Sequence, residues 1–313
     1  MTYKKKLYIL IAVTAVLALL YTGSLIFNSD FAARRSFFVW LDSETAKKTT
    51  RIVIKSYTGE YEISMQNNLW FILHDEKVFP ARQIRVQDFL NALTTRSSWE
   101  VRSSSASSHE RFGVDDMSAS RITLYADNSV ILDLILGGND VIRNETYFRR
   151  YGQNEVRSGD SSISTYINSS LTGWYNLRLL SGADGEPVDI STVQRVSVYT
   201  PEEVQTFTRR NRSWVITEIE IANPDISALE SYIRTILSTE GDSFSDISWE
   251  DPILDHSRIV LELGYGRALT IRLSEGDESG RVFAHVSGSD YVYSIPSWSA
   301  QRLFMPAESF ETL

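Results

Sequence analysis

The sequence predicts an α+β fold, in which an N-terminal transmembrane helix precedes two tandem related α+β units with mostly antiparallel sheets. Three observations lead to this class. An uncharged apolar run from Leu7 to Phe27 follows three lysines. A pattern of strand, tryptophan and proline occurs twice with the same spacing. In both copies, strand-like segments are grouped around one helix-like segment instead of alternating with helices, which is typical of antiparallel sheets.

The repeated pattern sets the domain organisation. Three pairs of features lie 144 residues apart: Arg51–Ile54 and Arg195–Val198, Trp70 and Trp214, and Pro80 and Pro224. One displacement shared by a strand, an aromatic residue and a proline indicates two similar units. We assign residues 49–180 to the first unit and residues 192–313 to the second, joined by a linker at 181–191 that is rich in turn-forming residues.

Residues 1–29 are expected to form a cytoplasmic tip and a membrane anchor. The run from Leu7 to Phe27 holds 21 residues without a charge, and a helix of that length spans roughly 30 Å, the thickness of the hydrocarbon layer. The preceding lysines place the amino terminus inside. We therefore expect a single-pass protein of the bacterial cytoplasmic (inner) membrane, with an uncleaved signal anchor, a juxtamembrane segment at 30–48 and a periplasmic body. A cleaved signal peptide is the alternative.

In the first unit, three strand-like segments come first. They are Arg51–Tyr57, Glu60–Met65 and Leu69–Leu73, which are rich in β-branched and aromatic residues. After Pro80, apolar residues at 86, 89, 90 and 93 have the spacing of an amphipathic helix. The serine-rich run Ser97–Ser108 is expected to be a loop. A hairpin of 121–125 and 130–136, strands near 146–151 and 155–157, and a short helix near 162–167 complete the unit.

The second unit repeats this order. We expect strands near 195–199, 203–208 and 213–217, a helix near 226–238, a hairpin of 258–261 and 268–273, strands at 282–286 and 291–295, and a terminal helix or turn at 296–304. The run Gly264-Tyr265-Gly266 has the composition of a phosphate-binding loop. Because a strand rather than a helix follows it, we expect a hairpin turn there.

The tryptophans and prolines of the repeat are expected to be structural anchors. Trp70 and Trp214 lie at equivalent places in strands, where a large aromatic side chain buries roughly 150–250 Å². If they were exposed, they could instead stack on sugar rings, and that alternative stays open. Pro80 and Pro224 lie shortly before a helix, a usual position for proline at a helix entry.

Arginines supply the remaining candidate residues. Arg121 and Arg258 begin the corresponding hairpins and count as repeat anchors. Arg209, Arg210 and Arg212 form the densest basic patch, in a turn between strands. A solvated turn is the first interpretation of this patch, and a site for an anionic partner is the alternative.

Composition excludes several kinds of site. The chain has no cysteine, which excludes disulfides, thiolate metal sites and a cysteine nucleophile. Its formal net charge is −9, so a nucleic-acid partner, which needs clustered positive charge, is not expected. The four histidines have no metal-ligand spacing, and no catalytic serine, zinc-helix or nucleotide-loop motif occurs. We therefore expect no catalytic residue, metal or cofactor, and a non-enzymatic protein.

Several of these motifs resemble a family of bacterial proteins known only as a domain of unknown function. The matching positions are Trp70 with Pro80-Ala81, Trp214 with Pro224-Asp225, and Phe112-Gly113-Val114-Asp115, which looks like the family's aromatic-Gly-Leu-Asp element before a strand. The segments from Phe148 to Val156 and from Phe283 to Tyr293 resemble its later strand pairs. The first unit departs from the pattern at Ala81-Arg82, where Pro-Ala-Asp is usual, and the second unit lacks the Phe-Gly element.

The resemblance implies a membrane anchor and repeated strand–Trp–Pro–helix units. Members are often encoded beside the gliding-motility type of ABC transporter, and the family assigns no catalytic residue. We therefore expect an extracytoplasmic accessory or scaffold protein of an ABC-transporter-type complex, whose partners are membrane proteins. The alternative is an envelope module that binds glycan or peptidoglycan.

Overall fold

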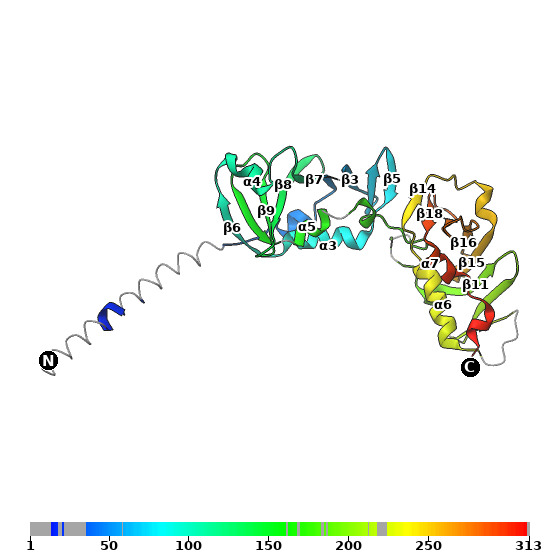
Figure 1. Ribbon diagram of the computed structural model, residues 1–313. Coiled ribbons are helices and arrows are strands. Elements are labelled where there is room, and N and C mark those ends of the chain that lie inside the picture. Colours follow the sequence, from blue (N-terminus) through cyan, green and yellow to red (C-terminus); the bar gives the residue numbers. More distant parts are fainter. Residues whose placement is uncertain are drawn as a thin grey trace, which may run out of the picture. The chain divides into compact units, whose positions relative to one another are not determined.

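The computed structural model describes residues 14–17, 21, 36–57, 59–160, 162–167, 170–182, 185, 187–211, 213–217 and 224–311. The chain forms two compact units (Figure 1). The first comprises Met1–Gln66, Phe71–Val78 and Ile84–Ser170, and the second comprises Asn67–Trp70, Phe79–Gln83 and Leu171–Leu313. The boundaries expected at 180 and 192 stay a prediction.

The first unit contains most of a sheet of ten strands, although residues 69–70 of β4 and 79–80 of β5 are grouped with the second unit. In sheet order they are β1 (Ser36–Phe38), β6 (Ser97–Ser103), β10 (Val156–Asp160), β9 (Glu145–Arg150), β8 (Ser129–Asp140), β7 (Ser120–Ala126), β2 (Arg51–Ser56), β3 (Gly59–Gln66), β4 (Leu69–His74) and β5 (Lys77–Pro80). Every pair from β1 through to β3 is antiparallel. The α-helices are short, apart from α3: α2 (Ser43–Ala46), α3 (Gln83–Thr94), α4 (His109–Phe112) and α5 (Ser162–Ile167).

The second unit is built on an antiparallel sheet of eight strands. In sheet order they are β13 (Ser213–Ile216), β12 (Val204–Arg210), β11 (Val193–Tyr199), β15 (Ser257–Leu263), β16 (Ala268–Leu273), β17 (Val282–Val286), β18 (Val292–Ile295) and β14 (Ser243–Ser245). The helices are α6 (Ile226–Ser238) and α7 (Ser297–Ala300), with single turns at η3 (Ile190–Thr192), η4 (Pro252–Asp255), η5 (Gly264–Gly266), η6 (Gln301–Leu303) and η7 (Ala307–Phe310).

The strand orders of the two sheets correspond position by position. The run β4-β3-β2-β7-β8-β9-β10-β6 in the first matches β13-β12-β11-β15-β16-β17-β18-β14 in the second. Trp70 is the second residue of β4, and Trp214 is the second residue of β13. Arg121 and Arg258 are likewise the second residues of β7 and β15.

The predicted α+β class is wrong, because both units are mostly β, with large antiparallel sheets. Part of the error comes from segments that form a strand although their composition indicates a loop. Ser97–Ser103 was expected to be a loop, but it forms β6 and pairs with both β1 and β10. In it, Ser97 and Trp99 are buried while the residues between and after them are more exposed, so the alternation of a strand is present although the residues facing inward include a small polar one.

The predicted transmembrane helix and the single-pass membrane localisation are also corrected. Among the residues that the structure describes, no helix is both long and apolar enough to cross a membrane. Most of the run from Leu7 to Phe27, and the adjoining residues up to 35, lie outside the described residues.

The core of the second unit lies between its sheet and α6 (Figure 1). The helix buries five residues of one face: Leu229, Tyr232, Ile233, Ile236 and Leu237. Its start is fixed by Asp225, whose carboxylate accepts from Ser227 N at 2.9 Å and from Ala228 N at 3.0 Å, as an N-cap does. The predicted helix at 226–238 is therefore confirmed, because spacing and cap agree.

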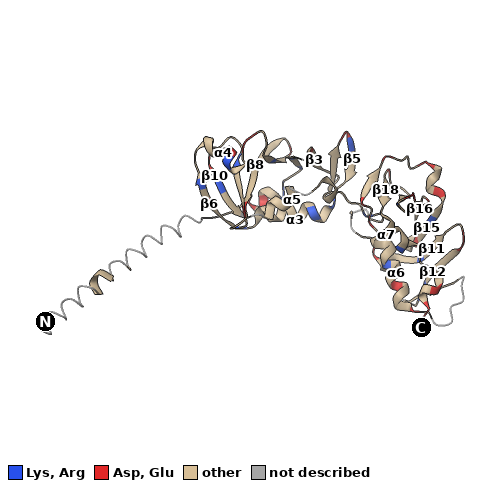
Figure 2. Cartoon of the chain, in the orientation of Figure 1, with Lys and Arg blue, Asp and Glu red and all other residues tan. Residues whose placement is uncertain are grey.

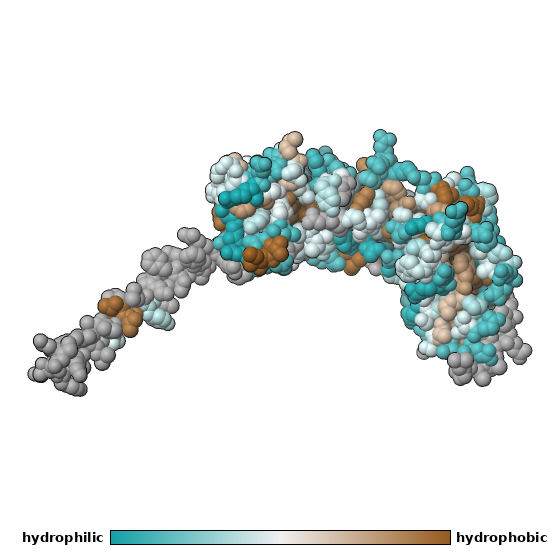
Figure 3. Space-filling model, in the orientation of Figure 1, coloured by the Kyte–Doolittle hydropathy of each residue, from teal (hydrophilic) through white to brown (hydrophobic). Residues whose placement is uncertain are grey.

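The surfaces of both units are mixed. Lysines and arginines are interspersed with acids over the chain (Figure 2). On the face drawn in Figure 3, hydrophilic residues predominate and the apolar patches are small and separate.

Candidate functional site

The two tryptophans of the repeat are buried side chains. Trp70 is 6% exposed and Trp214 is 3% exposed, and Trp214 belongs to the core that α6 covers. The side chain of Gln83 accepts from Trp70 N at 2.9 Å and donates to Trp70 O at 3.0 Å. It thereby forms the hydrogen bonds to the backbone N–H and C=O of Trp70 that a neighbouring strand would otherwise form. Neither indole ring offers an exposed face to a ligand.

The prolines lie at junctions between elements. Pro80 ends β5, and its carbonyl accepts from Asn176 N at 2.8 Å. Pro224 forms an isolated β-bridge with Glu311, directly before the N-cap residue of α6. Both are therefore placed to guide the chain into the next helix.

The predicted anchor arginines are engaged with neighbouring side chains. Arg121 forms a two-pronged ion pair with Asp133, at 2.9 and 2.7 Å, and its guanidinium lies 3.6 Å from the centre of the Tyr151 ring. Arg258 lies over the ring of Tyr199, at 4.3 Å. Such stacking and pairing stabilise strands from their surface.

The predicted basic patch is only partly described. Arg209 donates to the carbonyls of Ile190 at 3.3 Å and Ser191 at 2.7 Å, which ties it to η3. Arg210 is exposed. Arg212 lies outside the described residues, so the site for an anionic partner stays a prediction.

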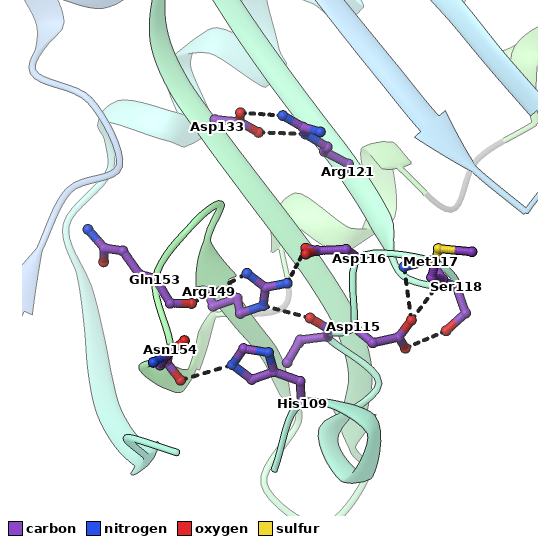
Figure 4. A network of polar contacts seen from close by, with 11 residues as sticks. His109, Asp115, Asp116, Met117, Ser118, Arg121, Asp133, Arg149, Gln153 and Asn154 are labelled. Atoms are coloured by element: carbon purple, nitrogen blue, oxygen red, sulfur yellow. Dashed lines mark hydrogen bonds and ion pairs between the residues drawn. The ribbon is translucent and has the colours of Figure 1, made fainter. Parts of the chain in front are cut away.

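The family motif at 112–115 is built into a polar network around Arg149 (Figure 4). Arg149 lies in β9 and is 3% exposed. Its Nε donates to Val114 O at 2.7 Å, and its Nη1 lies 3.4 Å from Gln153 O. Its Nη2 pairs with the carboxylate of Asp116. The buried guanidinium therefore fastens the motif to the sheet.

Each motif residue has a structural contact of its own. The Phe112 ring lies 4.8 Å from that of Tyr147, and Val114 is fully buried. Gly113 ends α4 with φ 66 in the left-handed region, where a side chain is disfavoured. Asp115 accepts from Met117 N at 3.0 Å and Ser118 N at 2.9 Å, and the Ser118 hydroxyl leads the hydrogen bonds that lower the pKa of Asp115. The contacts of this motif are therefore structural.

A cavity of about 810 Å³ in the second unit is a candidate site. Its lining comes from four separate stretches of chain, at 198–205, 256–257, 274–282 and 297–306. In an antiparallel sheet, the end of one strand and the start of the next meet at the same edge. The five neighbouring strands β12, β11, β15, β16 and β17 therefore bring these stretches to one end of the sheet.

The charged groups of this cavity are mainly acidic. Glu202, Glu203 and Glu275 line it, and its lining contains no lysine or arginine. None of these three carboxylates takes part in an ion pair recorded within the described part of the chain. His256 also belongs to the lining. The cavity therefore favours a positively charged ligand.

Gln205 contributes a buried acceptor to the same lining. It is 4% exposed, and its Nε2 donates to Glu203 Oε1 at 2.5 Å and to Met305 O at 3.1 Å. Both partners are acceptors, so these contacts fix the orientation of the amide. Its Oε1 has no hydrogen-bond partner, and an orphaned buried carbonyl is costly.

Two walls of the cavity are held rigidly. In the loop after β16, Asp277 accepts from the backbone of Ser279 and Arg281, each at 2.9 Å. Gly280, with φ 73, passes so close to α7 that an added Cβ would lie 3.0 Å from Ser297 Cβ. On the other wall, Tyr232 donates to Leu303 O at 2.6 Å. Burial raises the pKa of Tyr232, so the phenol stays a protonated donor.

A smaller cavity of about 240 Å³ lies in the first unit. Aromatic residues and arginines line it, including Trp99, Arg149 and Arg157. Two of its three arginines are already engaged, because Arg157 donates to Glu155 at 2.5 Å and Arg149 belongs to the network above, while the third, Arg150, is an exposed residue. It therefore offers less free binding capacity than the cavity of the second unit.

Neither Arg149 nor Gln205 was predicted from the sequence. For Arg149 a signal exists: Arg149 and Arg150 are adjacent in a strand, so one of them must face inward. For the cavity no comparable signal exists, because its lining comes from four stretches that are far apart in the chain. Among the described residues, no group of acidic or histidine side chains is arranged to hold a metal ion.

Comparison with known proteins gives a family and no function. No curated protein matches the chain, and no solved structure matches it. The family described as "Domain of unknown function (DUF4340)" matches residues 70–252, which is more than half of the chain. This range begins at Trp70 and includes the Phe112–Asp115 motif, Trp214 and Pro224. The chain therefore belongs to the DUF4340 family.

Proposed function

We propose that this protein is a non-enzymatic accessory or scaffold protein that works by holding a protein partner, and that the partner is part of an ABC-transporter-type complex of the gliding-motility kind. The transporter part of this proposal comes from the family resemblance. The holding role comes from the second unit, where a cavity of about 810 Å³ is formed at one end of a sheet.

The composition of the cavity wall is the observation that carries the proposal. Carboxylates, hydroxyls and two amides alternate with apolar side chains such as Phe304 and Met305, as in sites that recognise a ligand by shape and a few polar contacts. The polar groups with recorded contacts mostly serve the fold. Ser274 Oγ, for example, accepts from Phe283 N at 2.9 Å and donates to Glu275 O at 2.7 Å.

The glycan-binding alternative loses the residues on which it depended. It required Trp70 or Trp214 as a stacking platform, and both are buried. We therefore do not propose it as a second function.

We further propose that the two units are tandem copies of one architecture. The corresponding strand orders, and the matching places of the two tryptophans within them, support this. The second unit keeps the strand–Trp–Pro–helix pattern at Trp214, Asp225 and α6. The cavity is lined by loops whose sequences differ from those of the first unit. Duplication would then free one copy for a binding task.

Site-specific photo-crosslinking in the native host tests the proposed function. A photoreactive amino acid replaces Gln301, which is exposed and lines the cavity. The control position is Gln194, an exposed glutamine of β11 in the same unit that does not line the cavity. We expect Gln301 alone to give a discrete adduct that contains a transporter component, identified by mass spectrometry.

Two results would contradict the proposal. One is the same set of adducts from both positions, which indicates random collision. The other is the absence of any adduct from Gln301 while the protein is present at its normal level.

A further inference from the structure

We infer that the hairpin turn between β15 and β16 is a protein-binding surface, and that the ring of Tyr265 is its anchor, which enters an apolar pocket of the partner. The turn is Gly264-Tyr265-Gly266. It is separate from the cavity of the second unit. Ser257, at the start of β15, and Ser274, directly after β16, line that cavity, whereas the turn lies at the other end of both strands.

The backbone of Tyr265 adopts a conformation that disfavours a bulky side chain. Its φ is 64 and its ψ is 26, in the left-handed region. There the Cβ atom of an L-residue is crowded by a backbone carbonyl oxygen, which Asn and Asp tolerate best because their short side chains can hydrogen-bond locally. Among the residues that the structure describes, the other non-glycine residues with a positive φ are Asn or Asp, apart from Glu76.

The first unit shows that this hairpin does not need an aromatic residue in its turn. The corresponding turn joins β7 to β8, and its left-handed residue is Asp127, with φ 52. The side chain of Asp127 is exposed, as that of Tyr265 is. The same connection is therefore made with a residue that suits the conformation, so the fold does not explain the tyrosine of the second unit.

Packing does not offset the strain at Tyr265. The residue is fully exposed, at 104%. Its side chain forms no hydrogen bond, ion pair or ring contact with any other residue in the described part of the chain. The hydrogen bond from Leu263 N to Arg267 O, at 2.7 Å, closes the turn beneath it. Backbone strain that the surrounding structure maintains is concentrated at functional positions.

The exposed ring fits a protein partner. The residues on both sides of Tyr265 are glycines, so neither face of the ring is covered by an adjacent side chain. A ring that protrudes from a turn needs a concave receptor, which a folded protein can form. Tyrosine is enriched among the residues that dominate protein interfaces, since a large ring becomes ordered at a small entropic cost. Arg267 is exposed beside the turn and can pair with a carboxylate at the rim of the pocket.

Two other surfaces fit the turn less well. Insertion into a lipid surface relies on several apolar residues together, whereas this turn has one aromatic residue between two glycines. A sugar is recognised by polar groups placed around the aromatic ring, and the ring of Tyr265 protrudes away from such groups. A protein pocket therefore remains the class of partner that the geometry favours.

Stability measurements separate the fold from the surface. Tyr265→Asn removes the ring and places a residue that suits the left-handed region, so the full chain should melt at the temperature of the parent or above it. The mirror substitution, Asp127→Tyr, should lower the melting temperature by about 2–4 °C. Tyr265→Asn melting clearly below the parent would show that the ring serves the fold. Asp127→Tyr melting with the parent would remove the strain. Either result would overturn the inference.

Photo-crosslinking in the native host tests the binding. A photoreactive amino acid replaces Ala268 in the full chain, an exposed residue at the start of β16 beside the turn. We expect a discrete protein adduct, identified by mass spectrometry, whose yield falls roughly tenfold or more when Tyr265→Asn is added, because an anchor residue is lost. Tyr265→Phe keeps the ring and should retain most of the adduct.

Tyr57 supplies the matched control. It is another tyrosine in a turn between strands, joining β2 to β3, and it is 82% exposed. Tyr57→Asn should leave the adduct from Ala268 unchanged, because this substitution removes an exposed ring from a different turn. Equal loss of the adduct with Tyr57→Asn and Tyr265→Asn would contradict a specific role of Tyr265.

Other outcomes would also overturn the inference. An adduct of the same yield in the parent and in Tyr265→Asn would mean that the ring anchors nothing. The absence of any adduct from Ala268, with the protein at its normal level, would remove the protein partner. Sedimentation of the purified full chain with phosphatidylglycerol vesicles or with insoluble peptidoglycan, if Tyr265→Asn abolished it, would assign the ring to lipid or to glycan.

These outcomes are separable from those of the proposed function, because Gln301 reports on the cavity and Ala268 reports on the turn. If Gln301 crosslinks to a transporter component while Ala268 gives no adduct, only this inference fails. If Ala268 gives an adduct that depends on Tyr265 while Gln301 gives none, the surface at the turn stands and the proposed function fails.

Discussion

Arg149 is a buried charged residue that stabilises the first unit through hydrogen bonds. Its guanidinium is almost fully buried, and its partners are a carboxylate and two backbone carbonyls. Asp116, its ionic partner, is 58% exposed at its side chain. The carboxylate therefore keeps contact with water, and the network loses little solvation on that side. Its buried contacts are the hydrogen bond to Val114 O and the packing of its stem.

Replacing Arg149 should destabilise the first unit. Arg149→Met keeps most of the apolar volume but leaves Val114 O without its donor, which costs about 1–3 kcal/mol. Urea unfolding of the full chain measures the change. Arg150→Met is the matched control, since Arg150 is its exposed neighbour, and it should stay within about 0.5 kcal/mol of the parent. Equal effects of the two substitutions would show that burial of Arg149 has no energetic weight.

The tryptophans of the repeat should prove to be stabilising residues. Trp70→Ala or Trp214→Ala removes a side chain that is almost fully buried, which costs about 3–5 kcal/mol. Thermal unfolding should show a clearly lowered melting temperature for each. Trp298 is 65% exposed, so Trp298→Ala serves as the control and should leave the melting temperature nearly unchanged. Unchanged melting of Trp70→Ala and Trp214→Ala would overturn their structural role.

At the scale of elements, the sequence predicted those helices and strands whose formation depends on neighbouring residues in the chain. The helix α6 was predicted with its observed bounds because its apolar spacing and its cap Asp225 are both local. The strand β6 was missed because its serines suggest a loop, and only pairing with β1 and β10 makes it a strand. The cavity could not be predicted at all, since its lining joins stretches as far apart as 198–205 and 297–306.

The close approach of the family motif to strand β8 gives a prediction at this scale. A Cβ on Gly137 would lie 2.5 Å from both Phe112 O and Gly113 O. These are backbone atoms that cannot turn aside, so Gly137→Ala must displace the motif or the strand, at a cost of about 1–3 kcal/mol. The measurement is urea unfolding of the variant against the parent.

Gly138→Ala is the control for this substitution. There an added Cβ would meet Phe112 O at 3.8 Å, an ordinary contact. Gly138→Ala should therefore unfold close to the parent. If Gly137→Ala does so too, the motif does not need the close approach.

At the scale of the whole molecule, the spacing of 144 residues carried most of the information about architecture. It predicted corresponding places for Trp70 and Trp214, and both are second residues of strands with matching positions in their sheets. It did not predict that both units are mostly β. The α+β class was assigned because strand-like segments were grouped around one helix, and that assignment missed strands such as β6. Charge patterning could not reveal the acidic cavity either, since Glu202 and Glu275 are distant in sequence.

In a crystal structure of the chain, the first unit should superpose on the second. We expect the eight corresponding strands to overlay, with Trp70 on Trp214 and Arg121 on Arg258, because strand order and strand position already agree. The measurement is a backbone superposition of the two sheets. Placement of either pair on strands that do not correspond would refute the duplication.

The dispersed lining of the cavity has a thermodynamic consequence. Its four stretches meet only when the second unit is folded, so an unfolded chain has nothing for a ligand to bind. A ligand that occupies the cavity then acts as a chemical chaperone, and at a hundred times its dissociation constant it raises the free energy of unfolding by about 2.7 kcal/mol. Cellular levels of the protein would then follow the supply of its partner, because the unoccupied form is the one that proteases reach more often.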